Sequence, residues 1–92
     1  MPRVRTHHGE VLAEEYTHPL GLPSTELGRA IGVAGNRISD IVRQRRDMSA
    51  DTAIRLGRFF GVDPRSWLNL QSAYDLSVAE AEHDYSGVQR RA

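Results

Sequence analysis

The chain has 92 residues, no cysteine and a formal net charge of zero. That length predicts one domain with a modest hydrophobic core, and the lack of cysteine excludes disulfides and thiolate metal sites. No apolar run approaches the ~18 residues of a membrane span and the N-terminus lacks the apolar stretch of a signal peptide, so we expect a cytoplasmic protein without membrane contact.

Charge is unevenly distributed along this neutral chain. Residues 29–65 carry a net charge of +4, whereas residues 1–28 and 66–92 carry −2 each. Every cation is an arginine. This usage has two alternative explanations, which are genome composition and a need for bidentate contacts to phosphates and bases. A basic middle between acidic ends indicates a local anion-binding site.

Apolar residues recur with helical spacing, and no stretch alternates with period two. The sequence therefore predicts an all-α fold, a compact five-helix bundle of the Cro/repressor-like class. Ser49 and Asp63 are expected to cap helix N-termini, and Gly32 and Gly61 to end helices in the left-handed conformation. We expect helices over residues 9–17, 23–31, 35–44, 50–60 and 64 to about 82.

The second and third expected helices form a helix-turn-helix pattern. Gly28 lies where the helices would cross closely, and Gly32 lies in the turn between them. Ile38 and Ile41 would press the third helix onto the core, leaving its other face free for a DNA major groove. The alternative is that the same offsets only build a small helical bundle.

The face of the third helix opposite its isoleucines is polar. At 100° per residue, Asn36, Asp40 and Arg43 oppose the apolar stripe, and they are flanked by Arg37, Ser39 and Gln44. Three arginines at the end of this helix and in the turn after it, Arg43, Arg45 and Arg46, would lie near backbone phosphates.

The fifth helix is apolar on two sides. A stripe running from Trp67 through Leu70, Tyr74, Val78 and Ala81 is predicted to face the core. A second patch, formed by Leu68, Leu76 and Ala79, requires another partner. Self-association is the simplest one, since a two-fold dimer presents two reading helices about 34 Å apart. The alternative is that the polar tail folds back over the patch.

The sequence resembles a known family over roughly residues 7–79. The resemblance rests on the strings HHGEVLAEEY and GLPSTELGRAIGVAGNRISDIVRQRRDMSADTAIRLGRFFGVDPRSWLNLQSAYDL. Both are similar to HigA-type antitoxins, helix-turn-helix proteins of the Cro/repressor-like class. The resemblance implies an all-helical homodimer that binds a HigB-type toxin, an mRNA-cleaving ribonuclease, and represses its own operon by binding double-stranded DNA at its operator.

The resemblance also implies roles for individual residues. Ser24 would begin the second helix and contact phosphate. Asn36, Arg37 and Asp40 would read bases or position the reading helix. Combined with the helical periodicity, the predicted DNA-binding residues are Ser24, Thr25, Asn36, Arg37, Ser39, Asp40, Arg43, Gln44, Arg45 and Arg46.

Two departures from the family pattern affect this site. An Asn-Gly pair commonly follows the reading helix, whereas this chain has Arg43-Gln44. The missing glycine makes the turn less certain, although the added arginine strengthens phosphate affinity. Pro23 replaces the usual small polar cap of the second helix, which puts its first backbone phosphate contact in doubt.

Several residues allow more than one interpretation. Arg37 would contact DNA, at phosphate more readily than at a base, or it would pair with Asp40 three residues on. Asp40 would accept from a cytosine amine, or orient Arg37 or Arg43. The alternative functions are a stand-alone Cro-like repressor without a toxin, and a protein-interaction module whose third helix grips an acidic partner.

We expect no metal, no cofactor and no enzymatic activity. His7, His8 and His18 lie near acidic residues, but their spacing matches no metal site, and exposed polar residues at a helix start explain them. The chain is too small to enclose a sizeable cleft. The expected division is residues 1–8 as an N-terminal arm, 9–82 as the helix-turn-helix domain with its dimerisation helix, and 83–92 as a polar tail.

Overall fold

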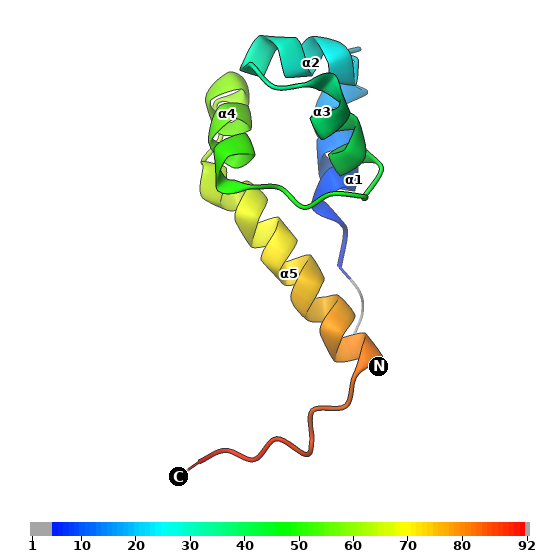
Figure 1. The fold of residues 1–92 in the computed structure, drawn as a ribbon, viewed down its shortest axis with the longest axis vertical. Helices are drawn as coiled ribbons and strands as arrows, with labels where there is room; N and C mark the ends of the chain where they lie inside the picture. The colour runs from blue at the N-terminus through cyan, green and yellow to red at the C-terminus, as the bar shows by residue number, and fades with distance from the viewer. Residues whose placement is uncertain (1–4, 92) are drawn as a thin grey trace.

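The computed structural model describes residues 5–91, and they form helices without any strand, as predicted (Figure 1). The division into arm, domain and tail stays a prediction, and its residues 1–4 and 92 lie outside the described range. No helix among the described residues is long and apolar enough to cross a bilayer. The elements are α1 (His8–Leu12), η1 (Ala13–Thr17), α2 (Ser24–Ile31), α3 (Gly35–Val42), α4 (Ala50–Phe60) and α5 (Pro64–Glu82).

The molecule is longer than a compact bundle of this size. Its extents are 50 × 24 × 19 Å and its radius of gyration is 15.5 Å, against about 12 Å expected for a compact chain of this length. Helices α1 to α4 and the beginning of α5 form the compact body, whereas the rest of α5 projects from it and the tail continues outward (Figure 1). The apolar core cluster consequently draws its α5 residues from the first turns alone, namely Trp67, Leu68 and Leu70.

The first helical segment begins one residue earlier than expected and changes its winding. His7 is the N-cap, and the Gly9 N–H donates to its Nδ1 at 2.8 Å. Residues Ala13–Thr17 form a turn of π-helix, closed by the His18 N–H donating to the Ala13 carbonyl at 2.9 Å. Thus α1 and η1 together occupy the range predicted for one helix.

The turn between α2 and α3 requires glycine, as predicted. Gly32 has φ of 79°, a left-handed conformation that glycine adopts without a steric penalty. Gly28 lies so close to the turn that a Cβ there would be 2.8 Å from the Val33 carbonyl oxygen and 3.1 Å from the Cα of Gly35. Gly35 in turn packs against Thr25, because a Cβ added to Gly35 would lie 3.0 Å from the Cα of Thr25. Small residues on both sides thus set how closely α3 approaches α2.

Helix α3 ends at Val42, two residues before the predicted end. Gln44 has φ of 63° and is the only non-glycine residue with positive φ among those described. The Arg45 N–H donates to the Asp40 carbonyl at 2.8 Å, and the Gln44 N–H to the Ile41 carbonyl at 3.0 Å. This is the same closing pattern that normally uses a glycine. Gln44 therefore occupies the left-handed position of this turn, at a cost of about 1–2 kcal/mol.

The core lies between α1, the helix-turn-helix and the first turns of α4 and α5. Ser49 and Asp63 cap α4 and α5 as predicted, and Gly61 ends α4 with φ of 72°. Pro23 occupies the N-cap position of α2, so this helix has no side-chain cap. The buried apolar residues that pack together are Leu12, Leu27, Ile31, Ile38, Ile41, Met48, Ala53, Leu56 and Trp67.

The prediction of which α5 residues face the core and which form a free patch requires a correction. Trp67 and Leu70 pack on the core as expected, but so does Leu68, which the sequence places in the second apolar patch. Only Leu76 in that patch is strongly exposed, at 62%, and Ala79 is half-buried. Leu68 lies in the first turns of α5, beside the body, whereas Leu76 lies on the projecting half. Position along the helix and the side of the helix both matter, because Ser77 on the projecting half is buried and accepts a hydrogen bond from the Arg5 N–H at 2.9 Å.

Substituting Gly28 tests the close approach of α2 to the turn. Gly28→Ala should lower the free energy of unfolding by about 1–3 kcal/mol, because the added methyl meets backbone that cannot move aside. Urea unfolding measures this change. Gly87→Ala is the matched control, since nothing lies within 4 Å of a Cβ at that position. Equal stability of the two variants would contradict the packing described here.

Candidate nucleic-acid interface

The predicted DNA-binding residues at the start of α2 and on α3 lie near one another. Thr25 packs against Gly35, which brings the first turn of α2 beside the first turn of α3. Thr25 and Asn36 are exposed, and Ser24 and Ser39 are half-buried. The Ser39 hydroxyl donates to the Asn36 carbonyl at 3.2 Å. A polar surface that includes the outer face of α3 results from this packing.

The linker after α3 carries three exposed arginines. Arg43, Gln44, Arg45 and Arg46 are all exposed. Asp40 lies 3.9 Å from the Arg46 guanidinium, so it pairs with neither Arg37 nor Arg43, the two partners expected from the sequence. Such an exposed pair contributes at most about 1 kcal/mol. The linker therefore presents cationic side chains next to the polar face of α3.

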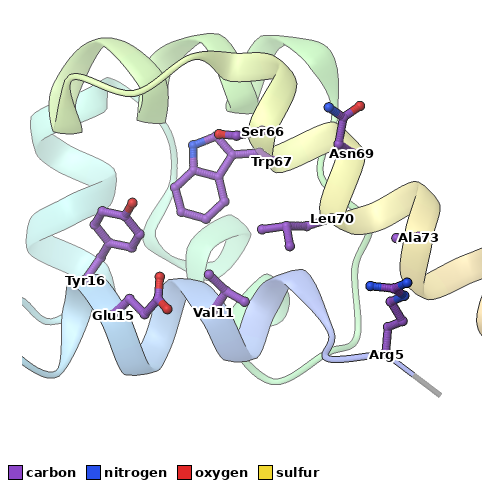
Figure 2. A pocket seen from close by; sticks show the side chains of 9 residues that line it. All are labelled: Arg5, Val11, Glu15, Tyr16, Ser66, Trp67, Asn69, Leu70 and Ala73. Carbon is purple, nitrogen blue, oxygen red and sulfur yellow. The ribbon is translucent and has the colours of Figure 1, made fainter. Parts of the chain in front are cut away.

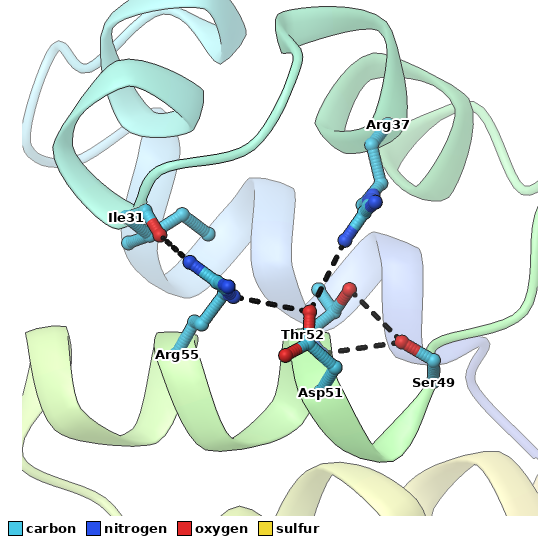
Figure 3. Close-up of polar contacts among 6 residues, drawn as sticks. All are labelled: Ile31, Arg37, Ser49, Asp51, Thr52 and Arg55. Atoms are coloured by element: carbon cyan, nitrogen blue, oxygen red, sulfur yellow. Dashed lines mark hydrogen bonds and ion pairs between the residues drawn. The ribbon is translucent and has the colours of Figure 1, made fainter.

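Arg37 belongs to an ionic network that joins three helices (Figure 3). Its Nη1 lies 3.3 Å from Asp51 Oδ2 at the start of α4, so its partner is Asp51 and not Asp40. The same carboxylate oxygen accepts from Arg55 Nε at 3.0 Å. Arg55 Nη1 donates in turn to the Ile31 carbonyl at 2.7 Å, at the end of α2. Asp51 thus connects the predicted reading helix to α4, and through Arg55 to α2.

The sequence-based site did not include Asp51 or Arg55. Their spacing of four residues in an expected helix indicates a local ion pair. No local pattern, however, reveals that Asp51 reaches Arg37, fourteen residues away on another helix. Only the packing of α4 against the helix-turn-helix shows this contact.

Two histidines at the start of α1 are buried, contrary to the expectation that they are exposed polar residues. His7 and His8 are 7% and 0% exposed, and their rings stack at 4.0 Å. The ring of His7 also contacts Tyr74 on α5 edge-on at 4.7 Å. Burial lowers the pKa of both rings, and for His8 the nearby Arg46 backbone and the Asp47 and Asp75 carboxylates offset only part of that effect.

Neither histidine forms a metal site with its neighbours. Residues 5–91 contain no group of three or more histidine and acidic side chains that could hold an ion. His18 is exposed and lies 3.7 Å from Glu14. Both ring nitrogens of His8 are buried without a hydrogen-bond partner, which is the cost of using a polar ring as a core residue.

A groove of about 470 Å³ lies between the first helical segment and α5 (Figure 2). It is open to solvent along one side. Glu15 and Arg5 lie toward its opposite ends in this view. The residues lining it are Arg5, Val11, Glu15, Tyr16, Ser66, Trp67, Asn69, Leu70 and Ala73.

Comparison with known proteins identifies helix-turn-helix relatives. A family model described as helix-turn-helix matches residues 13–67, more than half of the chain. Virulence-associated protein I of Dichelobacter nodosus is 51% identical over 82 residues, which cover 89% of this chain and 74% of that protein. The matched range 13–67 contains every residue predicted to bind DNA.

Two solved structures are similar over nearly the whole chain. Antitoxin GraA in complex with its operator has a TM-score of 0.93 at 39% identity, and the match covers 100% of this chain and 96% of that one. Pseudomonas aeruginosa antitoxin HigA with the higBA promoter has a TM-score of 0.79 at 37% identity, covering 97% and 100%. The likeness thus extends beyond the helix-turn-helix to α5.

The buried histidines predict a loss of stability in mild acid. Their folded-state pKa values lie below the ordinary value of 6.5, so the unfolded chain binds more protons in this range. The free energy of unfolding should be highest above pH 6.5 and should fall below it, by at most about 1.4 kcal/mol per pH unit for each histidine. Chemical denaturation between pH 8 and 5.5 measures this slope.

Two variants separate these histidines from other titrating groups. His8→Phe should flatten the slope, because it removes one buried base from a site with no hydrogen-bond partner. His18→Gln is the matched control, since His18 is exposed. An unchanged slope in His8→Phe would show that the acid sensitivity arises elsewhere.

Proposed function

The chain belongs to the HigA-type antitoxins of the helix-turn-helix family, and from that membership we propose that it binds its own operator as a homodimer and neutralises a HigB-type ribonuclease toxin. The observation that carries the DNA-binding part is the juxtaposition of the polar face of α3 with the exposed linker arginines. This role is binding, not catalysis, and it places the protein in the cytoplasm, where operator DNA lies.

The proposed DNA surface consists of the ten residues predicted from the sequence. Its centre is α3, where Asn36 and Arg37 would reach base edges or phosphates, and Arg43, Arg45 and Arg46 would contact the backbone. Arg37 can serve DNA without leaving Asp51, because the ion pair uses only one of the guanidinium nitrogens. Asp51 would then hold Arg37 in position for its DNA contact.

The proposed homodimer uses the projecting half of α5. Leu76 is strongly exposed there, and Ala79 lies on the same side of the helix one turn later. The proposal rests on this exposed leucine and on the extension of the helix beyond the body of its own chain (Figure 1). In a two-fold pair, two α3 helices could meet successive major grooves.

The proposal of a toxin partner rests on family membership and not on a site identified in this chain. Structures similar to this one include antitoxins named HigA and GraA. A short basic reading frame beside the gene would support the toxin, and its absence would favour the alternative of a stand-alone repressor. The other alternative, an acidic protein partner for α3, predicts steep salt dependence with that protein and none with DNA.

Arg37→Ala tests the DNA surface. We expect operator affinity to fall about tenfold or more, because one charge-assisted contact is lost. Stability should fall by less than about 1 kcal/mol, since the pair with Asp51 is exposed. Fluorescence anisotropy with an operator duplex measures the affinity. Arg58→Ala, an exposed arginine on α4, is the control. Equal affinity of Arg37→Ala and wild type would remove Arg37 from the surface.

Leu76→Glu tests the proposed dimer. A carboxylate at the centre of an apolar contact would have to be buried without a partner, so sedimentation should show monomers. Leu20→Glu is the matched control, because Leu20 is also 62% exposed but lies between η1 and α2. A Leu76→Glu variant that remains dimeric would place the interface on another surface.

A further inference from the structure

We propose that the groove between the first helical segment and α5 receives the C-terminal tail of a second copy of this chain, so that the two copies exchange tails. This inference rests on the proposed dimer. The groove is defined above by its lining residues, and the tail comprises residues 83–91.

The groove has the chemistry of a peptide site. Val11, Tyr16 and Leu70 line it and are only half-buried, so their remaining apolar surface faces the open side. Arg5 supplies a cation toward one end, beside Ala73, and Glu15 an anion toward the other (Figure 2). An occupant should therefore be apolar in the middle, with an acidic group at one end and a basic group at the other.

The tail carries that pattern in that order. Tyr85 and Val88 are 52% and 79% exposed, although both are large apolar residues. Asp84 precedes them, and Arg90 and Arg91 follow. A turn in which the Val88 N–H donates to the Tyr85 carbonyl at 2.9 Å brings the two apolar residues closer along the chain. The tail thus presents an acidic end, an apolar middle and a basic end.

The proposed dimer delivers the tail to the groove in the matching direction. In the proposed dimer, the two α5 helices pack antiparallel, with the two-fold axis between Leu76 and Ala79. The C-terminal end of the partner's α5 then lies beside Ala73. The partner's tail then runs from Ala73 toward Ser66, which places its acidic end near Arg5 and its basic end near Glu15 (Figure 2). The groove extends about 10 Å along α5. Residues 84–90 would span about 20 Å if extended, so they match the groove only with the turn between Tyr85 and Val88 kept.

The tail of the same chain lies far from this position. Helix α5 carries it outward from the body, so it would have to reverse direction to reach its own groove (Figure 1). Exchange between copies requires no reversal, and it would cover apolar surface on both partners at once.

Cysteine cross-linking tests the exchange, because the natural chain has no cysteine. One variant carries Ala73→Cys in the groove and a second carries Ser86→Cys in the tail. The two are mixed, oxidised and mapped by peptide mass. We expect a disulfide between chains that joins positions 73 and 86. Ala30→Cys is the control for Ala73→Cys, since Ala30 is exposed on α2 outside the groove, and it should not link to position 86.

A matched pair of tail substitutions tests how much the tail contributes to the free energy of dimerisation. Val88→Glu should weaken dimerisation about tenfold, because it removes the burial of an apolar side chain. Gln89→Glu makes the same charge change at the next exposed residue and should have a much smaller effect.

The outcomes distinguish the tail exchange from the proposed function. Dimers that bind the operator but form no link between positions 73 and 86 would overturn the exchange and leave the proposed function intact. A link within one chain of the doubly substituted Ala73→Cys, Ser86→Cys variant would also overturn it, because the tail would then occupy its own groove. Monomers that do not bind the operator would contradict both.

Discussion

The close approach of α2 to α3 is the constraint on which the rest of the structure depends. Gly28 and Gly35 leave no room for a side chain between the helices and the turn. The orientation of α3 is consequently set by backbone contact, which varies less than side-chain packing. This orientation buries Ile38 and Ile41 and leaves Asn36 exposed on the opposite face. The core and the proposed reading surface are thus two sides of one helix, and both depend on the same contact.

Asp51 holds this arrangement from the side of α4. It pairs with Arg37 on α3 and with Arg55, whose guanidinium donates to the last carbonyl of α2. The two arginine side chains are half-buried and Asp51 is exposed, so solvent screens both pairs and each contributes about 1 kcal/mol or less to stability. The contribution of the network is therefore mainly positional, since it restricts where Arg37 can point. The core beneath it, centred on residues such as Leu56, supplies the hydrophobic stabilisation.

The helices could be predicted from the sequence because their signals are local. Caps such as Ser49 and turn glycines such as Gly32 depend on a few neighbouring residues, and the structure confirms both. Tertiary contacts decided the rest. Gln44 adopts a glycine conformation that no propensity predicts, and His8 is a polar residue at the bottom of the core. The contact of Asp51 with α3 joins residues that only the fold brings together. The composition of the proposed DNA surface is a prediction from helical periodicity and from the family resemblance, whereas contacts that position it, such as Arg37 with Asp51, come only from the fold.

The central claim is that the basic, polar surface built on α3 recognises a specific DNA sequence. The most direct test is to titrate the protein onto the DNA just upstream of its gene and onto an unrelated duplex, over a series of salt concentrations. We expect tight binding to the upstream DNA alone, weakening steeply as salt rises because phosphate contacts release counterions. Equally weak binding to both duplexes would contradict it, since the arginines would then act only as nonspecific charge.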